Sequence, residues 1–301
     1  MIDIILQGTE LEIGDFKAAL KALAPEVTLL RRQDPSLRLC GVADDADLST
    51  LQAIAKAHAV DCIVVPAGLS VKQFKVFFTD MDSTLIENEC IEDMAFAAGR
   101  LDELHAAQAK CADEKRGFQE TLRASMKCLA EAPASALEHA VKAERFSFGA
   151  ENLIRLLKRG GVETYIISCG FSQVAQSAAK KLGMTGVVCN ELIVRSDGTL
   201  TGEIEGPAGG RLLDADGKRR AMEILAQRHD AKLSEVIAIG DGANDVEMIR
   251  AAGLGVAYHP KTALANLARV EINYGGLDVL AHLFIEAWKD AVELYRGTER
   301  A

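Results

Sequence analysis

Apolar and polar residues alternate in short blocks over the first 70 residues of the chain. Apolar runs typical of strands occur at residues 2–6, 27–30, 37–42 and 61–65, and stretches with helical spacing occur at residues 13–23 and 48–58. The resulting order, strand–helix–strand–strand–helix–strand, is that of a ferredoxin-like βαββαβ domain. We therefore predict an N-terminal ferredoxin-like domain at residues 1–70.

A different pattern begins after the turn signal Pro66-Ala67-Gly68. Residues 76–79, Val-Phe-Phe-Thr, form an unbroken apolar run that predicts a buried parallel strand. From residue 91 to about residue 143 the spacing of apolar residues is helical almost throughout. We interpret this stretch as a helical cap inserted at about residues 88–147.

Helices and strands alternate in the remainder of the chain. Helices are predicted at residues 150–159, 172–182, 218–228 and 245–252, and strands at residues 162–167, 187–188, 236–239 and 254–256. Alternation of this kind predicts an α/β fold with a doubly wound, mainly parallel sheet. Residues 71–301 would then form one catalytic domain that carries the helical cap as an insertion.

Three polar clusters stand directly after predicted strands. They are Asp80-Met81-Asp82, Ser168-Cys169-Gly170 and the run from Gly240 to Asp245. One aspartate or serine after a strand is most often a helix cap or a turn residue. Three clusters together, at the strand ends where open parallel sheets bind ligands, predict a functional site instead.

The residue types in these clusters indicate phosphate chemistry. Asp80 and Asp241 offer the hard oxygen ligands that Mg²⁺ prefers, and a cation offsets the repulsion between an attacking carboxylate and a phosphate dianion. Asp82 lies two residues beyond Asp80 and is suited to protonate a leaving alkoxide and later to activate water. Ser168 and the backbone N–H of Gly170 can cradle phosphate oxygens. These residues favour a magnesium-dependent phosphatase of small phosphomonoesters with Asp80 as nucleophile.

The motifs resemble those of the haloacid dehalogenase superfamily, whose phosphatases carry Asp-X-Asp-X-Thr, a serine or threonine, a lysine and Gly-Asp-X-X-X-Asp. Here these are residues 80–84, Ser168, Lys218 and residues 240–245. Within the superfamily the chain resembles phosphoserine phosphatases, through Phe-Thr-Asp-Met-Asp-Ser-Thr-Leu-Ile from Phe78, Asn190-Glu191-Leu192 and Leu200-Thr201-Gly202.

This resemblance implies a role for each matching residue. Asp80 would be the nucleophile, Asp82 the acid and base, and Glu89 the partner of a substrate amino group. The implied metal site comprises Asp80, Asp241, Asp245 and the backbone carbonyl of Asp82, and the implied phosphate contacts are Ser168, Gly170, Lys218 and Asn244. The resemblance also implies that the cap closes over a phosphorylated amino acid of serine biosynthesis.

Two positions depart from the family pattern. Ser125 stands where an arginine normally holds the substrate carboxylate, and a serine cannot reproduce the charged, bidentate fork of a guanidinium. Cys169 stands where glycine is usual, next to the expected phosphate contacts. Two alternatives therefore stay open: a phosphatase of another small phosphomonoester, and a catalytically silent protein that senses a metabolite.

Composition narrows the class of protein further. The net charge of −10 disfavours nucleic acid as a partner, and no apolar run approaches the length of a membrane span. The seven cysteines are widely spaced and contain no CxxC pair, which favours neither disulfides nor zinc. With no basic apolar leader, we expect a cytoplasmic protein. The N-terminal domain resembles ACT domains, and ligand binding, packing or homodimer formation are all open roles for it.

Overall fold

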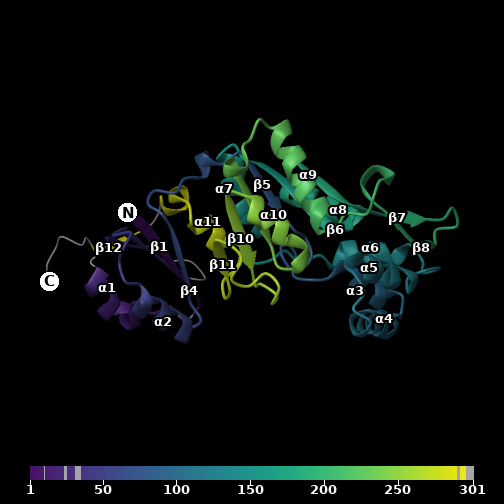
Figure 1. Cartoon of the computed structure of the whole chain (residues 1–301), viewed down its shortest axis with the longest axis horizontal. Coiled ribbons are helices and arrows are strands. Elements are labelled where there is room, and N and C mark those ends of the chain that lie inside the picture. Colours follow the sequence, from purple (N-terminus) through teal and green to yellow (C-terminus); the bar gives the residue numbers. More distant parts are fainter. Residues whose placement is uncertain (10, 24–25, 31–34, 290–291, 296–301) are drawn as a thin grey trace.

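The computed structural model describes residues 1–9, 11–23, 26–30, 35–289 and 292–295. Two β-sheets organise this part of the chain, one of five strands and one of seven. Figure 1 shows the smaller sheet at one end of an elongated molecule, the larger sheet in the middle and the cap helices at the other end. In the described part, no helix is long and apolar enough to cross a membrane.

The five-stranded sheet is antiparallel, with strand order β12-β2-β3-β1-β4. The predicted ferredoxin-like order of elements is confirmed, and a strand from the C-terminal end of the chain extends the sheet by pairing with β2. The boundary at residue 70 stays a prediction. The elements are β1 (Ile2–Gln7), α1 (Lys17–Leu23), β2 (Glu26–Leu30), β3 (Ser36–Val42), α2 (Ser49–Ala57), β4 (Asp61–Pro66) and β12 (Val292–Tyr295).

The seven-stranded sheet has the order β11-β10-β9-β5-β6-β7-β8, and all of its pairs are parallel except β7 with β8. The predicted doubly wound α/β fold is confirmed. Its strands are β5 (Val76–Thr79), β6 (Glu163–Phe171), β7 (Gly186–Val194), β8 (Leu200–Glu205), β9 (Val236–Gly240), β10 (Leu254–Tyr258) and β11 (Val270–Ile272). Its helices are α7 (Ala150–Arg159), α8 (Ser172–Leu182), α9 (Ala215–Arg228), α10 (Val246–Ala251) and α11 (Asp278–His282).

Three of these elements, β8, β11 and α11, were not predicted. β8 contains Gly202 and two acidic residues, and β11 is only three residues long, so neither produces a clear apolar pattern. β8 forms a hairpin with β7 that reaches the cap, where the backbone of Leu200 exchanges hydrogen bonds of 2.8 Å with Glu131 and Ala132. This hairpin therefore ties the cap to the edge of the large sheet.

The inserted segment folds into four helices, in agreement with its helical spacing. They are α3 (Cys90–Ala97), α4 (Leu101–Asp113), α5 (Phe118–Lys127) and α6 (Ser135–Ala143). Gly99 lies between α3 and α4 with a φ of 68°, a conformation that glycine adopts without strain. Gly117 is the N-cap of α5. These two glycines thus stand at boundaries of the cap helices.

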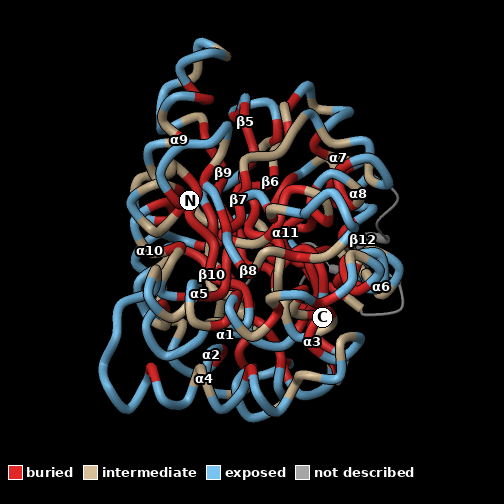
Figure 2. Tube along the Cα trace, turned by 90° about the vertical axis from the view of Figure 1, so that its right-hand side faces the viewer, coloured by how far each residue is buried: buried red, intermediate tan, exposed pale blue. Residues whose placement is uncertain are grey.

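Buried apolar side chains connect the two sheets. Figure 2 shows the buried segments gathered in the interior of the molecule. The largest apolar cluster runs from Ile5 and Ile63 of the N-terminal sheet, through Leu69 and Phe74, to Phe77 of β5. Burial of apolar area stabilises such contacts by about 25 cal/mol per Å². The N-terminal domain is therefore docked on the catalytic domain through a shared core.

A buried ion pair reinforces this docking. Arg38 on β3 pairs with Asp3 on β1 at 2.7 Å, and Arg38 also donates to the carbonyl oxygen of Leu283 at 3.2 Å. The guanidinium lies 6.0 Å from the centre of the Trp288 ring, whose N–H donates to the carbonyl of His282. Arg38 therefore links the N-terminal sheet to the segment that follows α11.

We expect Arg38→Met to lower the free energy of unfolding by about 3–5 kcal/mol, because it leaves the buried Asp3 carboxylate without its cation. Urea unfolding followed by fluorescence of Trp288, the single tryptophan of the chain, measures this change. Arg250→Met, which removes an ion pair whose members are about half exposed, serves as the control and should cost under about 1 kcal/mol. Equal losses in the two variants would contradict the role of the buried pair.

Candidate active site

The carboxyl ends of three adjacent parallel strands, β9, β5 and β6, meet at one edge of the large sheet. The backbone N–H of Asp80, just beyond β5, donates to the carbonyl of Ile239 on β9 at 2.9 Å, which fixes the relative position of two of these ends. β6 continues beyond its predicted end at residue 167, and its pairing with β7 is irregular between Ser168 and Phe171. The three polar clusters of the sequence therefore lie together.

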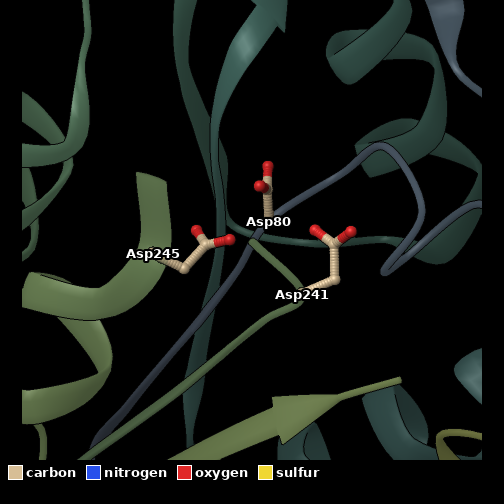
Figure 3. A group of neighbouring side chains, drawn as sticks. All are labelled: Asp80, Asp241 and Asp245. Carbon is tan, nitrogen blue, oxygen red and sulfur yellow. The ribbon is translucent and has the colours of Figure 1, made fainter. Parts of the chain in front are cut away.

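Three carboxylates converge at this edge. Asp80, Asp241 and Asp245 are buried, and one oxygen of each lies within 4.8 Å of the others. Figure 3 shows the three side chains next to one another: Asp80 follows β5, and Asp241 and Asp245 both belong to the segment between β9 and α10. A Cβ atom on Gly240 would come within 2.3 Å of the Asp245 carboxyl carbon, so only glycine fits before Asp241.

Lys218 supplies the buried positive charge of this cluster. Its Nζ lies 2.6 Å from Asp80 Oδ2 and 2.8 Å from Asp245 Oδ1, and its side chain is fully buried. Burial alone would lower the pKa of Lys218, but the carboxylates of Asp245 and Asp80 raise it well above its ordinary value. The lysine therefore stays charged. It lies in the first turn of α9, whose N-cap Asp214 accepts a hydrogen bond from the N–H of Gly217.

Three donors set the orientation of the Asp80 carboxylate. Besides Lys218, the side-chain N–H of Asn244 donates to Oδ2 at 3.2 Å, and the backbone N–H of Met81 donates to Oδ1 at 2.7 Å. Asp245 is held in a similar way, because its Oδ2 accepts from the N–H of Gly242 at 3.2 Å while its Oδ1 contacts Lys218. Both Asp245 oxygens are thus engaged by protein donors.

Asp82 lies apart from the acidic cluster. Its Oδ1 accepts a hydrogen bond of 2.9 Å from the N–H of Cys90, the first residue of the cap helix α3. Burial, and then the negative charge of Glu89, raise the pKa of Asp82 to about 7. A Cβ atom on Gly170 would come within 2.7 Å of Asp82 Oδ2, so glycine at position 170 leaves room for this carboxyl. Asp82 can therefore exist in either protonation state near neutral pH.

The second cluster, at the end of β6, is held by a buried asparagine. Asn190 donates to the carbonyl of Cys169 at 2.8 Å and accepts from the N–H of Leu213 at 2.8 Å, which ties this turn to the segment before α9. Ser168 Oγ accepts from the N–H of Gly170 at 2.9 Å. Burial raises the pKa of the Cys169 thiol to about 12, so the thiol is protonated and is a packed side chain rather than a nucleophile.

A cavity of about 240 Å³ lies between the acidic cluster and the cap. The core lines it with Asp80, Asp82, Ser168, Cys169, Gly170, Phe171, Asp241, Asn244 and Lys261, and the cap lines it with Glu89, Ile91, Gln108, Phe118, Thr121, Leu122 and Ser125. Ser125 is buried at the cavity, as its place on α5 predicts, whereas Arg123 is exposed and is not among the lining residues. The predicted site residues surround one space, with Lys218 and Asp245 just behind its wall.

Lys261 was not predicted from the sequence. Its Nζ lies 2.8 Å from Asp241 Oδ2 and 3.5 Å from Glu89 Oε1. Burial raises the pKa of Glu89, and the hydroxyl of Ser83, which donates to its Oε1 at 2.8 Å, opposes this shift. The rule that functional residues follow strand ends could have found Lys261, because it stands three residues after β10.

The acidic cluster fits a divalent cation. Its carboxylate oxygens are hard donors, they lie close enough to share one ion, and they come from buried side chains. Burial raises the pKa of Asp241, and Asp80 raises it further, while Lys261 lowers it. A bound cation would relieve the mutual repulsion of these carboxylates.

Comparison with known proteins agrees with this site. A family model for haloacid dehalogenase-like hydrolases matches residues 77–250. The phosphoserine phosphatase of Streptomyces coelicolor is 36% identical over 243 residues, which cover 81% of this chain and 58% of the relative. The phosphoserine phosphatase of Albidiferax ferrireducens is 35% identical, and the match covers 77% of this chain and 98% of the relative.

A solved structure extends the similarity to the whole fold. The probable phosphoserine phosphatase of Vibrio cholerae, in its unliganded form, superimposes with a TM-score of 0.78 at 26% identity, over 95% of this chain and 87% of that one. The chain therefore belongs to the haloacid dehalogenase-like hydrolase family. The family resemblance of its motifs is confirmed. This chain spans less than three fifths of the length of the Streptomyces relative.

We expect Glu89→Gln to lower the pKa of Asp82, because it removes the nearby negative charge that helps to raise this pKa to about 7. Titration of the Asp82 carboxyl by ¹³C NMR in metal-free protein measures the shift. Glu92→Gln removes an equal charge from an exposed position on the same helix and serves as the control. A pKa of Asp82 that is equally low in both variants, or unchanged in both, would contradict this electrostatic coupling.

Proposed function

We propose that the chain is a phosphomonoester hydrolase that acts on O-phosphoserine through an aspartyl-phosphate at Asp80. The observation that carries the proposal is the Asp80 carboxylate itself, held by Lys218 and Asn244 at the wall of the cavity between core and cap. A titratable carboxyl, Asp82, lines the same cavity. The named activity of the relatives supports phosphoserine as the substrate.

In the first step, a carboxylate oxygen of Asp80 attacks phosphorus, and the bond from phosphorus to the serine oxygen breaks. The electron pair of the broken bond goes to that oxygen, and Asp82 donates its proton there, so that serine leaves as a neutral alcohol. The raised pKa of Asp82, about 7, supports this role because an ordinary aspartic acid would hold no proton at neutral pH.

In the second step, Asp82 is a carboxylate and takes a proton from a water molecule in the cavity. The water oxygen bonds to phosphorus, the bond between phosphorus and Asp80 breaks, and phosphate leaves. The hydrogen bond from the N–H of Cys90 holds Asp82 in place through both steps. Ser168, Gly170, Lys218 and Asn244 would bind the phosphate oxygens, since they meet at this end of the cavity or directly behind it.

We propose magnesium as the cation of the acidic cluster, held by Asp80 and Asp241 with the predicted backbone carbonyl of Asp82. When bound, it would supply positive charge against the repulsion between the Asp80 carboxylate and the phosphate dianion. Asp245 would then act mainly by positioning Lys218, because both of its oxygens already accept from protein donors.

The two alternatives lead to different expectations. A phosphatase of another small phosphomonoester is suggested by the neutral Ser125 at the cavity, and a substrate panel separates it from the first proposal. A catalytically silent sensing protein would gain nothing from a fully buried lysine between two carboxylates, an arrangement that is costly to desolvate. Phosphatase activity is therefore the better-supported proposal.

We expect Asp80→Asn to lower phosphate release from O-phosphoserine by at least about 10³-fold, because an amide cannot form the acyl phosphate. A coupled phosphate assay measures the rate, and circular dichroism checks the fold. Asp44→Asn, at an exposed carboxylate of the N-terminal domain, serves as the matched control with unchanged activity. Turnover by Asp80→Asn near the wild-type rate would rule out the covalent mechanism.

We expect metal removal to abolish activity, since the carboxylates of the acidic cluster would repel the phosphate group. Phosphate release is measured for phosphoserine, phosphothreonine, phosphoethanolamine and sugar phosphates after chelation and again after addition of Mg²⁺. Phosphoserine should give the highest kcat/KM, and Mg²⁺ should restore it. A higher kcat/KM for a sugar phosphate would favour the alternative substrate class.

A further inference from the structure

Negatively charged side chains outnumber positively charged ones in the lining of the cavity. Of its sixteen lining residues, four carry carboxylates, namely Asp80, Asp82, Glu89 and Asp241, and Lys261 alone carries a permanent positive charge. Lys218 lies behind the wall, between two carboxylates. Among the described residues, Lys261 is therefore the one lining cation that can meet a negatively charged substrate group other than the phosphate.

Lys261 and Glu89 form a pair of opposite charges at this cavity. Lys261 Nζ lies 3.5 Å from Glu89 Oε1, and the same oxygen accepts from Ser83, which holds the glutamate at the start of the cap. Asp241 holds Lys261 on its other side at 2.8 Å. An ammonium has three N–H donors, so two carboxylate partners among the described residues leave it one donor for a third acceptor.

We propose that Lys261 binds the carboxylate of an α-amino acid head group, beside Glu89, whose contact with the ammonium is the one that the family resemblance implies. This inference rests on the proposed phosphatase function and adds a specificity-determining residue to it. An α-amino acid carries its ammonium and its carboxylate on the same carbon, so a positive and a negative charge lie side by side. Glu89 and Lys261 likewise place a negative and a positive charge side by side. Charge-assisted hydrogen bonds to both groups would orient the phosphate toward Asp80.

The cap contributes no positively charged side chain to the described lining of the cavity. Ser125 on α5 is buried at the cavity, and its hydroxyl can donate one neutral hydrogen bond. Arg123, two residues earlier, is exposed and lies outside the lining, as expected for residues that point to different sides of a helix. Carboxylate recognition therefore comes from the core segment after β10, while ammonium recognition comes from Glu89, the N-cap residue of α3.

The experiment compares kcat/KM for O-phospho-L-serine and O-phosphoethanolamine, which keeps the ammonium but lacks the carboxylate, at saturating Mg²⁺. Lys261→Met should lower the value for phosphoserine about 10- to 100-fold, the scale of one charge-assisted hydrogen bond, and change that for phosphoethanolamine less than about threefold. Lys261→Arg should retain most of the phosphoserine activity. Lys142→Met, at an exposed lysine of α6, should leave both values unchanged.

Each other outcome has a distinct meaning. Equal losses of kcat/KM for both substrates in Lys261→Met would show that Lys261 acts through Asp241, and this outcome would overturn the proposal. Calorimetric titration with Mg²⁺ would then give a Kd for Mg²⁺ that differs from that of the wild-type protein. No loss for either substrate also overturns it. If the wild-type protein cleaves phosphoethanolamine but not phosphoserine, recognition of the amino acid is refuted and the phosphatase activity stands. If the wild-type protein releases phosphate from neither substrate, nor from p-nitrophenyl phosphate, the proposed function itself is refuted. Thermal unfolding of each variant confirms that the compared proteins are folded.

Discussion

The buried ammonium of Lys218 is the constraint on which the site depends. Three buried carboxylates lie within 4.8 Å of one another, and without a cation between them their mutual repulsion would favour protonation or separation. Lys218 lies against two of them, Asp80 and Asp245, so it draws the segments after β5 and β9 toward the start of α9. The same contact holds the Asp80 carboxylate at the wall of the cavity, where a carboxylate nucleophile must lie.

The cap is hydrogen-bonded to the candidate active site through residues that belong to the site or lie next to it. The N–H of Cys90 donates to Asp82, and Ser83 donates to Glu89, so the first turn of α3 is set by residues next to the nucleophile. On the opposite side, Gln119 of α5 donates to Asp214, the N-cap of the helix that carries Lys218, at 2.6 Å. The position of the cap and the orientation of the catalytic groups are therefore coupled.

The N-terminal sheet is covered on both faces. Helices α1 and α2 pack on one face through Leu39 and Leu51, and the catalytic domain packs on the other through Ile63. At the β4 edge, Asp61 accepts hydrogen bonds from the backbone N–H groups of residues 273–275. His259 stands two residues before Lys261, and its Nε2 lies 2.9 Å from the carbonyl oxygen of Gly275. The N-terminal domain thus supports the segment that presents Lys261, which is a structural contribution to the site.

The sequence by itself determined the α/β fold and the group formed by Asp80, Asp82, Ser168 and Asp241, because strand patterns are local and parallel strands bring their carboxyl ends to one edge. It also placed Ser125 and Glu89 on the cap, although their roles rested on resemblance. Tertiary structure alone decided which charges pair: Lys261 with Asp241 and Glu89, and Asp245 with Lys218. It likewise decided that Asn190 joins two loops and that the last strand returns to the first sheet. Such contacts join residues far apart in sequence, so their partners depend on how the whole chain packs and leave no periodic signal to read.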